Sequence, residues 1–320
     1  MEILNIMEGA SKAVRTCLAV KPEEKVLIVT DSGKLEIGLA LMAAATEVAD
    51  ATMMIMKPRT RHGEEPPKPI AAAMRESDVI FIPTTFSLTH TAARAEATKS
   101  GARVASMPMI TKDMMAIGAM TADYTKVAEL GERLLRALEG AKEATLTSAA
   151  GTNIKMNLEG RSFMAESGLF SKPGAFGNLP AGEVAVAPVE DTAEGVLVID
   201  GSLALLGMVK EPITLAFHKG TVTEITGGKE ALELKKYLKN LDDPNAYRLA
   251  ELGIGINEKA RIIGNLLEDE KALRTAHCAI GSNSTVGGKI ISKTHIDGII
   301  LDPTLEVNGK TILSKGTVAV

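Results

Sequence analysis

The alternation of short apolar runs with helical segments over the first 125 residues constrains the fold of this chain most strongly. The run at 25–30 (KVLIVT) is apolar apart from its two ends, as a strand covered on both faces requires. Three further apolar runs, with helical segments between them, follow at 52–56, 78–82 and 102–106. Strands that alternate with helices in this way are typically parallel and joined by right-handed crossovers. We therefore predict an α/β fold that begins with a small doubly wound parallel sheet.

The character of the sequence changes after a predicted amphipathic helix at 123–142. Residues 143–227 contain short β-like runs divided by clusters of glycine and proline, and a helical segment follows at 229–240. Two domains also agree with a length of 320 residues, which exceeds the usual size of one domain. We predict a Rossmann-like α/β domain at 1–142 and a second, mainly β (α+β) domain at 143–320.

Charge and cysteine content narrow the classes of partner and compartment. A formal net charge of −4 gives no broad basic field, which argues against nucleic acid but leaves a small anionic ligand open. The two cysteines, Cys17 and Cys278, are no disulfide framework, which favours a reducing compartment. The first residues (MEILNIMEGASKAV) lack the basic segment of a secretory signal, and no stretch of about 20 apolar residues predicts a membrane span. We expect a cytoplasmic protein whose partner is a small molecule.

One histidine and one aspartate alternate with apolar residues in the segment 293–301 (KTHIDGIIL). If this segment is a strand, its period of two places His295 and Asp297 on the same face. An imidazole and a carboxylate on one face can converge on a divalent metal ion. The alternative is a hairpin rim at which both side chains meet water.

A second histidine, His277, lies in an apolar run just before the glycine-rich segment 281–289. A polar group buried in such a run needs a partner, which can be a metal ion or a hydrogen bond to the backbone. On a strand, the neighbouring Cys278 would face away from His277, and no further signal supports it as a nucleophile.

Two glutamates stand beside glycines and apolar residues. Glu183 follows NLPAG and precedes VAVAP, and Glu251 begins the run ELGIGIN. A carboxylate in apolar surroundings is costly unless it is paired or bound to a metal ion. Each glutamate is therefore a candidate metal ligand, and a solvated loop acid is the alternative.

The first half of the chain offers a weaker candidate, the polar segment 84–90 after the third predicted strand. Ligands of parallel sheets gather beyond the carboxyl ends of the strands, so the side chains of this segment could contact a substrate or a partner subunit. The candidates are Thr84, Thr85, Ser87 and His90. Helix capping by Ser87 or Thr89 is the interpretation we favour. His62 belongs to a predicted solvated loop.

Several of these segments together resemble the aminopeptidase T/S family of metallopeptidases. The resemblance extends in order over residues 150–305, and its motifs are GTN at 151–153, LEGR at 158–161, NLPAGEV at 178–184, ELGIGIN at 251–257, EDEK at 268–271, HCAIG at 277–281 and HID at 295–297. Several motifs in one order are more specific than any one of them. The first half of the chain resembles the family more loosely.

The resemblance implies a homodimeric aminopeptidase that removes N-terminal residues from peptides. It implies two divalent ions per chain, Zn²⁺, Co²⁺ or Mn²⁺, which would activate a water molecule. The implied metal ligands are three carboxylates and two imidazoles: Glu183, Glu251, His277, His295 and Asp297. Glu183 or Glu251 would in addition bridge the ions or relay a proton in catalysis.

One position departs from the family. The family usually has a tyrosine seven residues after the first histidine, where this chain has Ser284. A related branch resembles 2,5-dihydroxypyridine ring-cleaving dioxygenases, which hold one non-haem Fe²⁺ ion. His277, His295 and Asp297 would suit such an ion, with Glu251 as the alternative to His277. A relative that binds a metal ion or a ligand without catalysis is the third possibility, and the number and identity of bound ions would separate the three.

Overall fold

The computed structural model describes residues 2–320, with side chains from residue 5 onward, and they form two compact units. One unit contains the chain up to Ala128 together with Glu166–Ala181, and the other contains Glu129–Ala165 and Gly182–Val320. The division falls within helix α6 (Tyr124–Ala137), whereas the sequence places it after residue 142. The later segment Glu166–Ala181 also belongs to the first unit, so one boundary in the sequence cannot describe the division.

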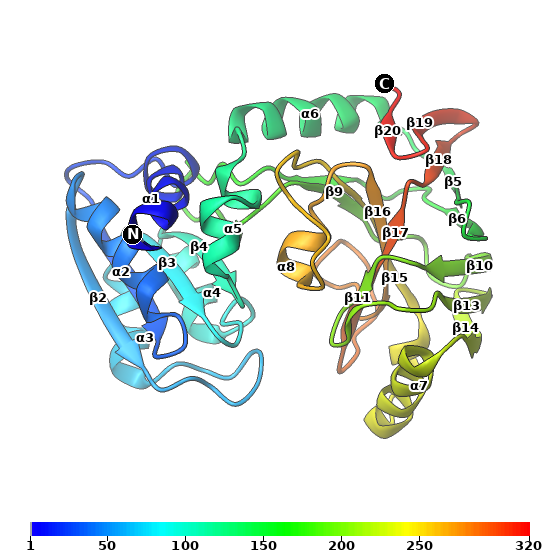
Figure 1. Cartoon of the computed structure of the whole chain (residues 1–320), viewed down its shortest axis with the longest axis horizontal. Helices are drawn as coiled ribbons and strands as arrows, with labels where there is room; N and C mark the ends of the chain where they lie inside the picture. Colours follow the sequence, from blue (N-terminus) through cyan, green and yellow to red (C-terminus); the bar gives the residue numbers. More distant parts are fainter. Residues whose placement is uncertain (1) are drawn as a thin grey trace. The chain divides into compact units, whose positions relative to one another are not determined.

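A five-stranded parallel sheet with the order β2-β1-β3-β4-β8 forms the centre of the first unit (Figure 1). Its strands are β1 (Lys25–Asp31), β2 (Asp50–Met56), β3 (Val79–Thr84), β4 (Arg103–Pro108) and β8 (Phe176–Asn178). The helical segments of this unit are α1 (Glu2–Lys12), the π-helical turn η1 (Ala13–Cys17), α2 (Leu35–Thr46), α3 (Lys68–Arg75), α4 (Ala92–Lys99), α5 (Lys112–Ala116) and the 3₁₀ turn η2 (Ala119–Thr121). The predicted α/β class and the parallel sheet are confirmed.

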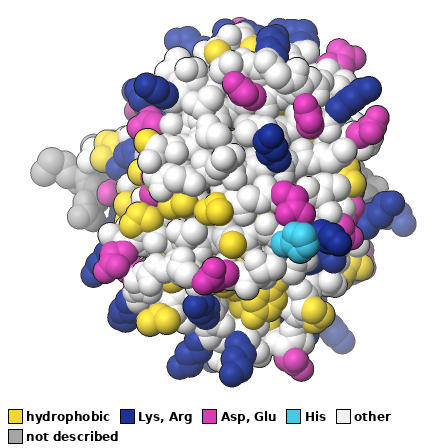
Figure 2. All heavy atoms as spheres, turned by 90° about the vertical axis from the view of Figure 1, so that its right-hand side faces the viewer, with side chains coloured by type: hydrophobic (Ala, Val, Ile, Leu, Met, Phe, Trp, Pro, Cys, Tyr) yellow, Lys and Arg dark blue, Asp and Glu magenta, His cyan; other side chains and the backbone are white. Residues whose placement is uncertain are grey.

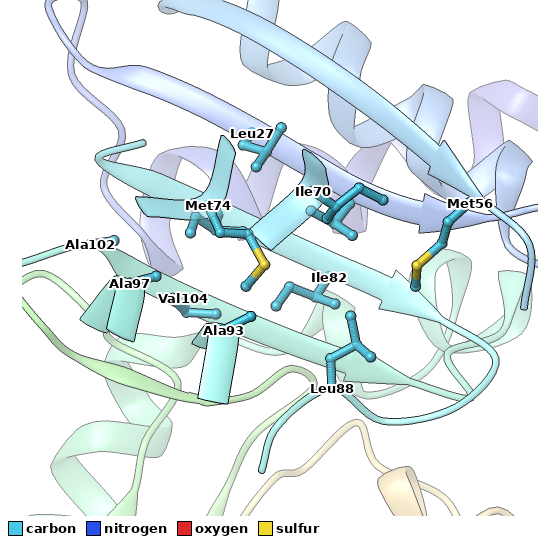
Figure 3. Packing of buried hydrophobic residues seen from close by; sticks show 12 residues of the cluster. Leu27, Met56, Ile70, Met74, Ile82, Leu88, Ala93, Ala97, Ala102 and Val104 are labelled. Carbon is cyan, nitrogen blue, oxygen red and sulfur yellow. The ribbon is translucent and has the colours of Figure 1, made fainter. Parts of the chain in front are cut away.

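Apolar side chains on one face of this sheet pack against α3 and α4 (Figure 3). Leu27 and Ile82 from the strands meet Ile70 and Met74 from α3, and all four are at most 3% exposed. The alternate residues of β1 face α2, where Gly38 lies against Thr30. Burial on both faces explains why β1 and β3 are continuous apolar runs in the sequence.

The second unit contains two largely antiparallel sheets. The larger has the order β14-β13-β10-β6-β5-β18-β19-β20. Its strands are β5 (Glu143–Thr147), β6 (Asn153–Asn157), β10 (Glu194–Ile199), β13 (Ile213–His218), β14 (Thr221–Thr226), β18 (Thr304–Val307), β19 (Lys310–Ser314) and β20 (Thr317–Val318). The mainly β character predicted for the second half is therefore confirmed.

The smaller sheet has the order β12-β11-β17-β16-β15-β9-β7. Its strands are β7 (Met164–Glu166), β9 (Glu183–Val186), β11 (Ser202–Leu203), β12 (Gly207–Met208), β15 (Leu249–Gly255), β16 (Thr275–Gly281) and β17 (His295–Leu301). The remaining helical segments of this unit are α7 (Lys229–Leu241), η3 (Pro244–Tyr247) and α8 (Leu266–Asp269). All five metal-ligand candidates lie on β9, β15, β16 and β17, which are neighbours in this sheet.

Acidic and basic side chains are interspersed over the face of the molecule shown in Figure 2. Across residues 2–320, no helix combines the length and the apolar character needed to cross a membrane.

Candidate metal centre

The register of four neighbouring strands brings the candidate ligands onto one face of the smaller sheet. Asp297 of β17 pairs with Ala279 of β16, and Ala279 pairs with Glu251 of β15. His277 pairs in the same way with Gly253. Polar ligand candidates thus alternate with very small residues across the strands, which leaves room above the sheet for long side chains to meet.

The opposite face of these strands is apolar. Leu252, Cys278 and Gly298 pair across the three strands and alternate in sequence with the polar positions. Cys278 therefore faces away from His277, as its position on a strand predicts. Burial also raises the pKa of the Cys278 thiol far above its usual range. The thiol is neutral and does not belong to the polar cluster.

The first group of possible metal ligands consists of Glu251, His295 and Asp297. The Nε2 atom of His295 lies 3.3 Å from Glu251 Oε2 and 3.3 Å from Asp297 Oδ1. The other ring nitrogen, Nδ1, lies 2.6 Å from the carbonyl oxygen of Ser282. Because a carbonyl can only accept a hydrogen bond, Nδ1 carries a proton, and Nε2 is the ring nitrogen that faces the carboxylates and is available to an ion. His295 is 31% exposed, whereas Glu251 and Asp297 are almost buried.

The second group consists of Glu183, Glu251 and His277, so Glu251 belongs to both groups. His277 Nε2 lies 3.3 Å from Glu183 Oε2 and 3.6 Å from Glu251 Oε1. The imidazole is fully buried, and neither of its nitrogens has a hydrogen-bond partner among the described residues. Buried polar atoms without a partner are rare and need an explanation.

The arrangement of both groups fits divalent metal ions. Donor atoms about 2.0–2.2 Å from one ion lie ~3.3–3.6 Å apart when they occupy the corners of a tetrahedron. The imidazole–carboxylate separations in the two groups, 3.3–3.6 Å, match that spacing and are long for hydrogen bonds. A mixed set of imidazole and carboxylate donors suits Zn²⁺, Mn²⁺, Co²⁺ and Fe²⁺. An ion bound in the second group would also give the unpartnered His277 Nε2 a partner.

The carboxylates and imidazoles of the cluster strongly perturb one another. Burial opposes a charge on His277, but Glu251 and Glu183 beside it outweigh burial and raise its pKa to about 9. Burial likewise opposes a charge on His295, and Asp297 and Glu251 raise its pKa well above the usual value. Burial opposes ionisation of Glu251 as well, but the two imidazoles hold its pKa far below the usual range. An ion that binds here therefore replaces protons on the imidazoles.

A buried lysine that the sequence singles out only through the resemblance motif lies beside this cluster. Lys271 follows α8 and is 0% exposed. Its Nζ atom lies 2.6 Å from Glu183 Oε1 and 2.6 Å from Glu270 Oε1. Burial raises the pKa of both glutamates, and Lys271 counteracts this. A lysine directly after three acidic residues was the available signal, but the sequence did not indicate its burial.

Gly253 is a second residue of the site that the sequence analysis did not recognise. A Cβ atom on Gly253 would lie 1.9 Å from His277 Nε2 and 2.2 Å from His277 Cε1. The imidazole thus covers the glycine of the neighbouring strand, and no larger residue fits beneath it in this position.

The polar segment 84–90 belongs to the first unit. The N-cap of α4 is Thr91, whose side chain accepts a hydrogen bond from Arg94 N, so the prediction of Ser87 or Thr89 as the cap is wrong. The Ser87 hydroxyl instead donates to Thr89 Oγ1, because a tight turn precedes the helix. His62 is exposed, as predicted, and its Nδ1 accepts a hydrogen bond of 3.1 Å from Ser87 N.

The family comparison matches nearly the whole chain. The family model described as NicX: 2,5-dihydroxypyridine 5,6-dioxygenase matches residues 6–320. The chain belongs to this family. The 2,5-dihydroxypyridine 5,6-dioxygenase of Pseudomonas putida KT2440 is 27% identical over 258 residues, which cover 77% of this chain and 72% of that protein. Aminopeptidase AmpS of Bacillus subtilis is 27% identical over 210 residues, which cover 59% of this chain and 48% of the aminopeptidase.

Two solved structures share the fold of this family member. The structure of 2,5-dihydroxypyridine dioxygenase from Pseudomonas putida KT2440 matches with a TM-score of 0.82 and 21% identity, over 98% of this chain and 97% of that one. Wild-type AmpT from Thermus thermophilus matches with a TM-score of 0.72 and 16% identity, over 99% of each chain. The resemblance to the aminopeptidase T/S family and its dioxygenase neighbour is thereby confirmed, and the chain belongs to a fold shared by enzymes of both kinds.

Proposed function

We propose that this chain is a metal-dependent dioxygenase that opens the ring of a hydroxylated pyridine of the 2,5-dihydroxypyridine type. The observation that carries the proposal is the family match over residues 6–320, which includes every candidate ligand. Ser284, at the position of the family tyrosine of the peptidases, agrees with this choice because a phenol that would assist hydrolysis is missing.

One Fe²⁺ ion is the proposed cofactor, held by Glu251, His295 and Asp297. When bound, a non-haem Fe²⁺ ion supplies open positions at which O₂ and a substrate can meet. The ligand set predicted for iron from the sequence has His277 as its third member, with Glu251 as the alternative. The distances favour Glu251, because both its Oε2 atom and Asp297 Oδ1 lie 3.3 Å from His295 Nε2.

The surrounding residues of the chain hold these ligands in place and handle protons. The Ser282 carbonyl fixes the tautomer and the orientation of His295. His277 Nε2 lies between the carboxylates of Glu183 and Glu251, which raise the pKa of the imidazole to about 9, so near neutral pH it would hold a proton that it can donate. Burial of this imidazole excludes water from the proton that it holds.

A second candidate function is the removal of N-terminal residues from peptides. It is supported by the two three-residue groups that share Glu251, because two ions bridged by one carboxylate are the arrangement that a two-metal hydrolase needs. In that case Glu183 and His277 would be ligands of the second ion, and Zn²⁺, Co²⁺ or Mn²⁺ would supply an activated water molecule. Glu183 or Glu251 would relay the proton from that water.

The test compares the two reactions on the same preparation. Protein freed of metal is loaded anaerobically with Fe²⁺ in one sample and with Zn²⁺, Co²⁺ or Mn²⁺ in others. We expect the Fe²⁺ sample to consume O₂ in equal amount to the 2,5-dihydroxypyridine that disappears, and His295→Ala to abolish this reaction. His62→Ala is the matched control, because His62 is an exposed residue of the other unit. Hydrolysis of aminoacyl amides by the other samples, without O₂ consumption by the first, would contradict the dioxygenase and support the peptidase.

A further inference from the structure

The buried ammonium group of Lys271 is the feature of the site that neither proposed reaction uses. Lysine is among the residues that are rarely buried completely unless paired. Here the side chain is 0% exposed, and its Nζ atom donates to two carboxylate oxygens, Glu183 Oε1 and Glu270 Oε1, each at 2.6 Å. Two charge-assisted hydrogen bonds of this length hold the ammonium group firmly.

The backbone around Lys271 also fixes the position of this charge. The Lys271 carbonyl accepts a hydrogen bond of 2.8 Å from Asn257 N, and Lys271 N donates to the Glu268 carbonyl at 3.0 Å. Glu268 is itself buried and paired with Arg261 at 3.1 Å. The ammonium group is therefore delivered by an anchored turn and is not a flexible side chain that happens to reach the site.

Lys271 affects the two ligand groups very differently. In the group of Glu183, Glu251 and His277, one oxygen of Glu183 is already occupied by the ammonium group, and the other faces His277. An ion bound there would share the Glu183 carboxylate with a fixed positive charge. The group of Glu251, His295 and Asp297 has no lysine or arginine in ion-pair contact among the described residues, so its carboxylates remain available to an ion.

We propose that the Lys271 ammonium group takes the place of a second metal ion, so that the chain binds one divalent ion, at Glu251, His295 and Asp297. Glu183 is then a partner of Lys271 and a positioning residue for His277, not a metal ligand. This inference rests on the proposed dioxygenase with its single ion, and it argues against the second candidate function, which needs an ion at Glu183 and His277 as well. It also explains how four carboxylates are neutralised. The Lys271 charge neutralises Glu183 and Glu270, and the ion would neutralise Glu251 and Asp297.

The test counts Mn²⁺ ions, because this ion needs no substrate and is visible by electron paramagnetic resonance. Wild-type protein freed of metal is titrated with Mn²⁺, and bound ions are counted by equilibrium dialysis with plasma mass spectrometry. We expect one ion per chain and the spectrum of an isolated ion. Lys271→Met has a side chain of similar length without the charge and should take up two ions, whose shared Glu251 couples their spins and reduces the signal of an isolated ion. Lys271→Arg keeps the charge and should remain at one.

A second pair of variants tests the inference if Lys271→Met does not fold. Glu183→Gln should still bind one ion, because Glu183 is not its ligand, whereas Glu251→Gln should lose it. Two ions in the wild type, one ion in both the wild type and folded Lys271→Met, or loss of the ion in Glu183→Gln would each overturn this inference while leaving a metal centre. No uptake by the wild type would instead refute the proposed function.

Discussion

Replacement of Gly253 by alanine tests whether the close approach of two strands positions His277. The added Cβ atom would lie 1.9 Å from His277 Nε2, so the ring must move by more than 1 Å to reach even a 3.0 Å contact. His277 Nε2 lies 3.6 Å from a carboxylate oxygen of Glu251, the residue shared by both ligand groups, so movement of the ring would displace this carboxylate. Metal-ligand distances stay within about 0.2 Å of their usual values, so such a displacement weakens metal binding. We expect metal affinity to fall about 10–100-fold, as for other residues that support a ligand. Overpacking of this kind should also lower the free energy of unfolding by about 1–3 kcal/mol.

The assay is a Mn²⁺ titration followed by urea unfolding of the same samples without metal. Gly131→Ala is the matched control, because Gly131 lies in α6 and its Cβ would approach side-chain atoms at 3.3 Å. The double variant Gly253→Ala/His277→Ala separates the clash from other effects, since without the imidazole the new methyl group has room. If Gly253→Ala lowers the stability of the protein equally with and without the His277 ring, contact between these two residues is not the cause and the reasoning is refuted.

Three further outcomes follow from other features of the site and its surroundings. His295→Ala should reduce metal bound per chain, measured by plasma mass spectrometry, whereas His62→Ala should leave it unchanged; equal metal content in both would contradict the ligand assignment. Although burial opposes it, hydrogen bonds from Lys289 N and other neighbours lower the pKa of Glu190 from 4.5 to about 2, so the stability that this carboxylate contributes is present above pH 4.5 and is lost as the pH falls toward 2. Glu190→Gln should therefore flatten the fall in urea midpoint over this acid range, and an unchanged fall would exclude the carboxylate as its cause. The Cys278 thiol, buried and with a raised pKa, should resist iodoacetamide at pH 8 in the folded protein and react in urea, as peptide mass mapping would show; rapid reaction in the folded state would contradict its placement on the apolar face.

Periodicity in the sequence was sufficient to predict the parallel sheet and the face of β17 that carries the ligands. The run at 25–30 became β1 (Lys25–Asp31), and His295 and Asp297 project from the same side of β17 because they are two residues apart. Periodicity did not predict strand β8. Its three residues carry no periodic signal, and they enter the first sheet by pairing with β4, about 70 residues earlier in the chain. Pairings of such separation depend on the tertiary fold, which no local pattern encodes.

The residues that support the ligands escaped prediction for a related reason. The resemblance motifs pointed to the five ligand candidates, but motifs do not say which neighbour occupies each carboxylate. Lys271 could be recognised as the partner of Glu183 only when the turn after α8 was placed beside β9. In the same way, the glycine in ELGIGIN has no evident role until β15 is paired in register with β16 and the imidazole of His277 is found above it.

A β-bulge and small residues together make this face of the sheet suitable for a metal centre. In β15 the register shifts between Leu249, which pairs with Ile280, and Glu251, which pairs with Ala279. A strand with strict alternation would place Leu249 and Glu251 on the same face, so the bulge turns the apolar side chain away and keeps the carboxylate with the ligands. Ala279 in the centre then lets carboxylates from β15 and β17 reach one imidazole nitrogen. Such a concentration of buried acids costs stability unless cations neutralise it, and a ligand that binds only the folded state returns that stability in proportion to its occupancy. An ion bound at this cluster would therefore stabilise the second unit, as the Lys271 charge does on the other side of Glu183.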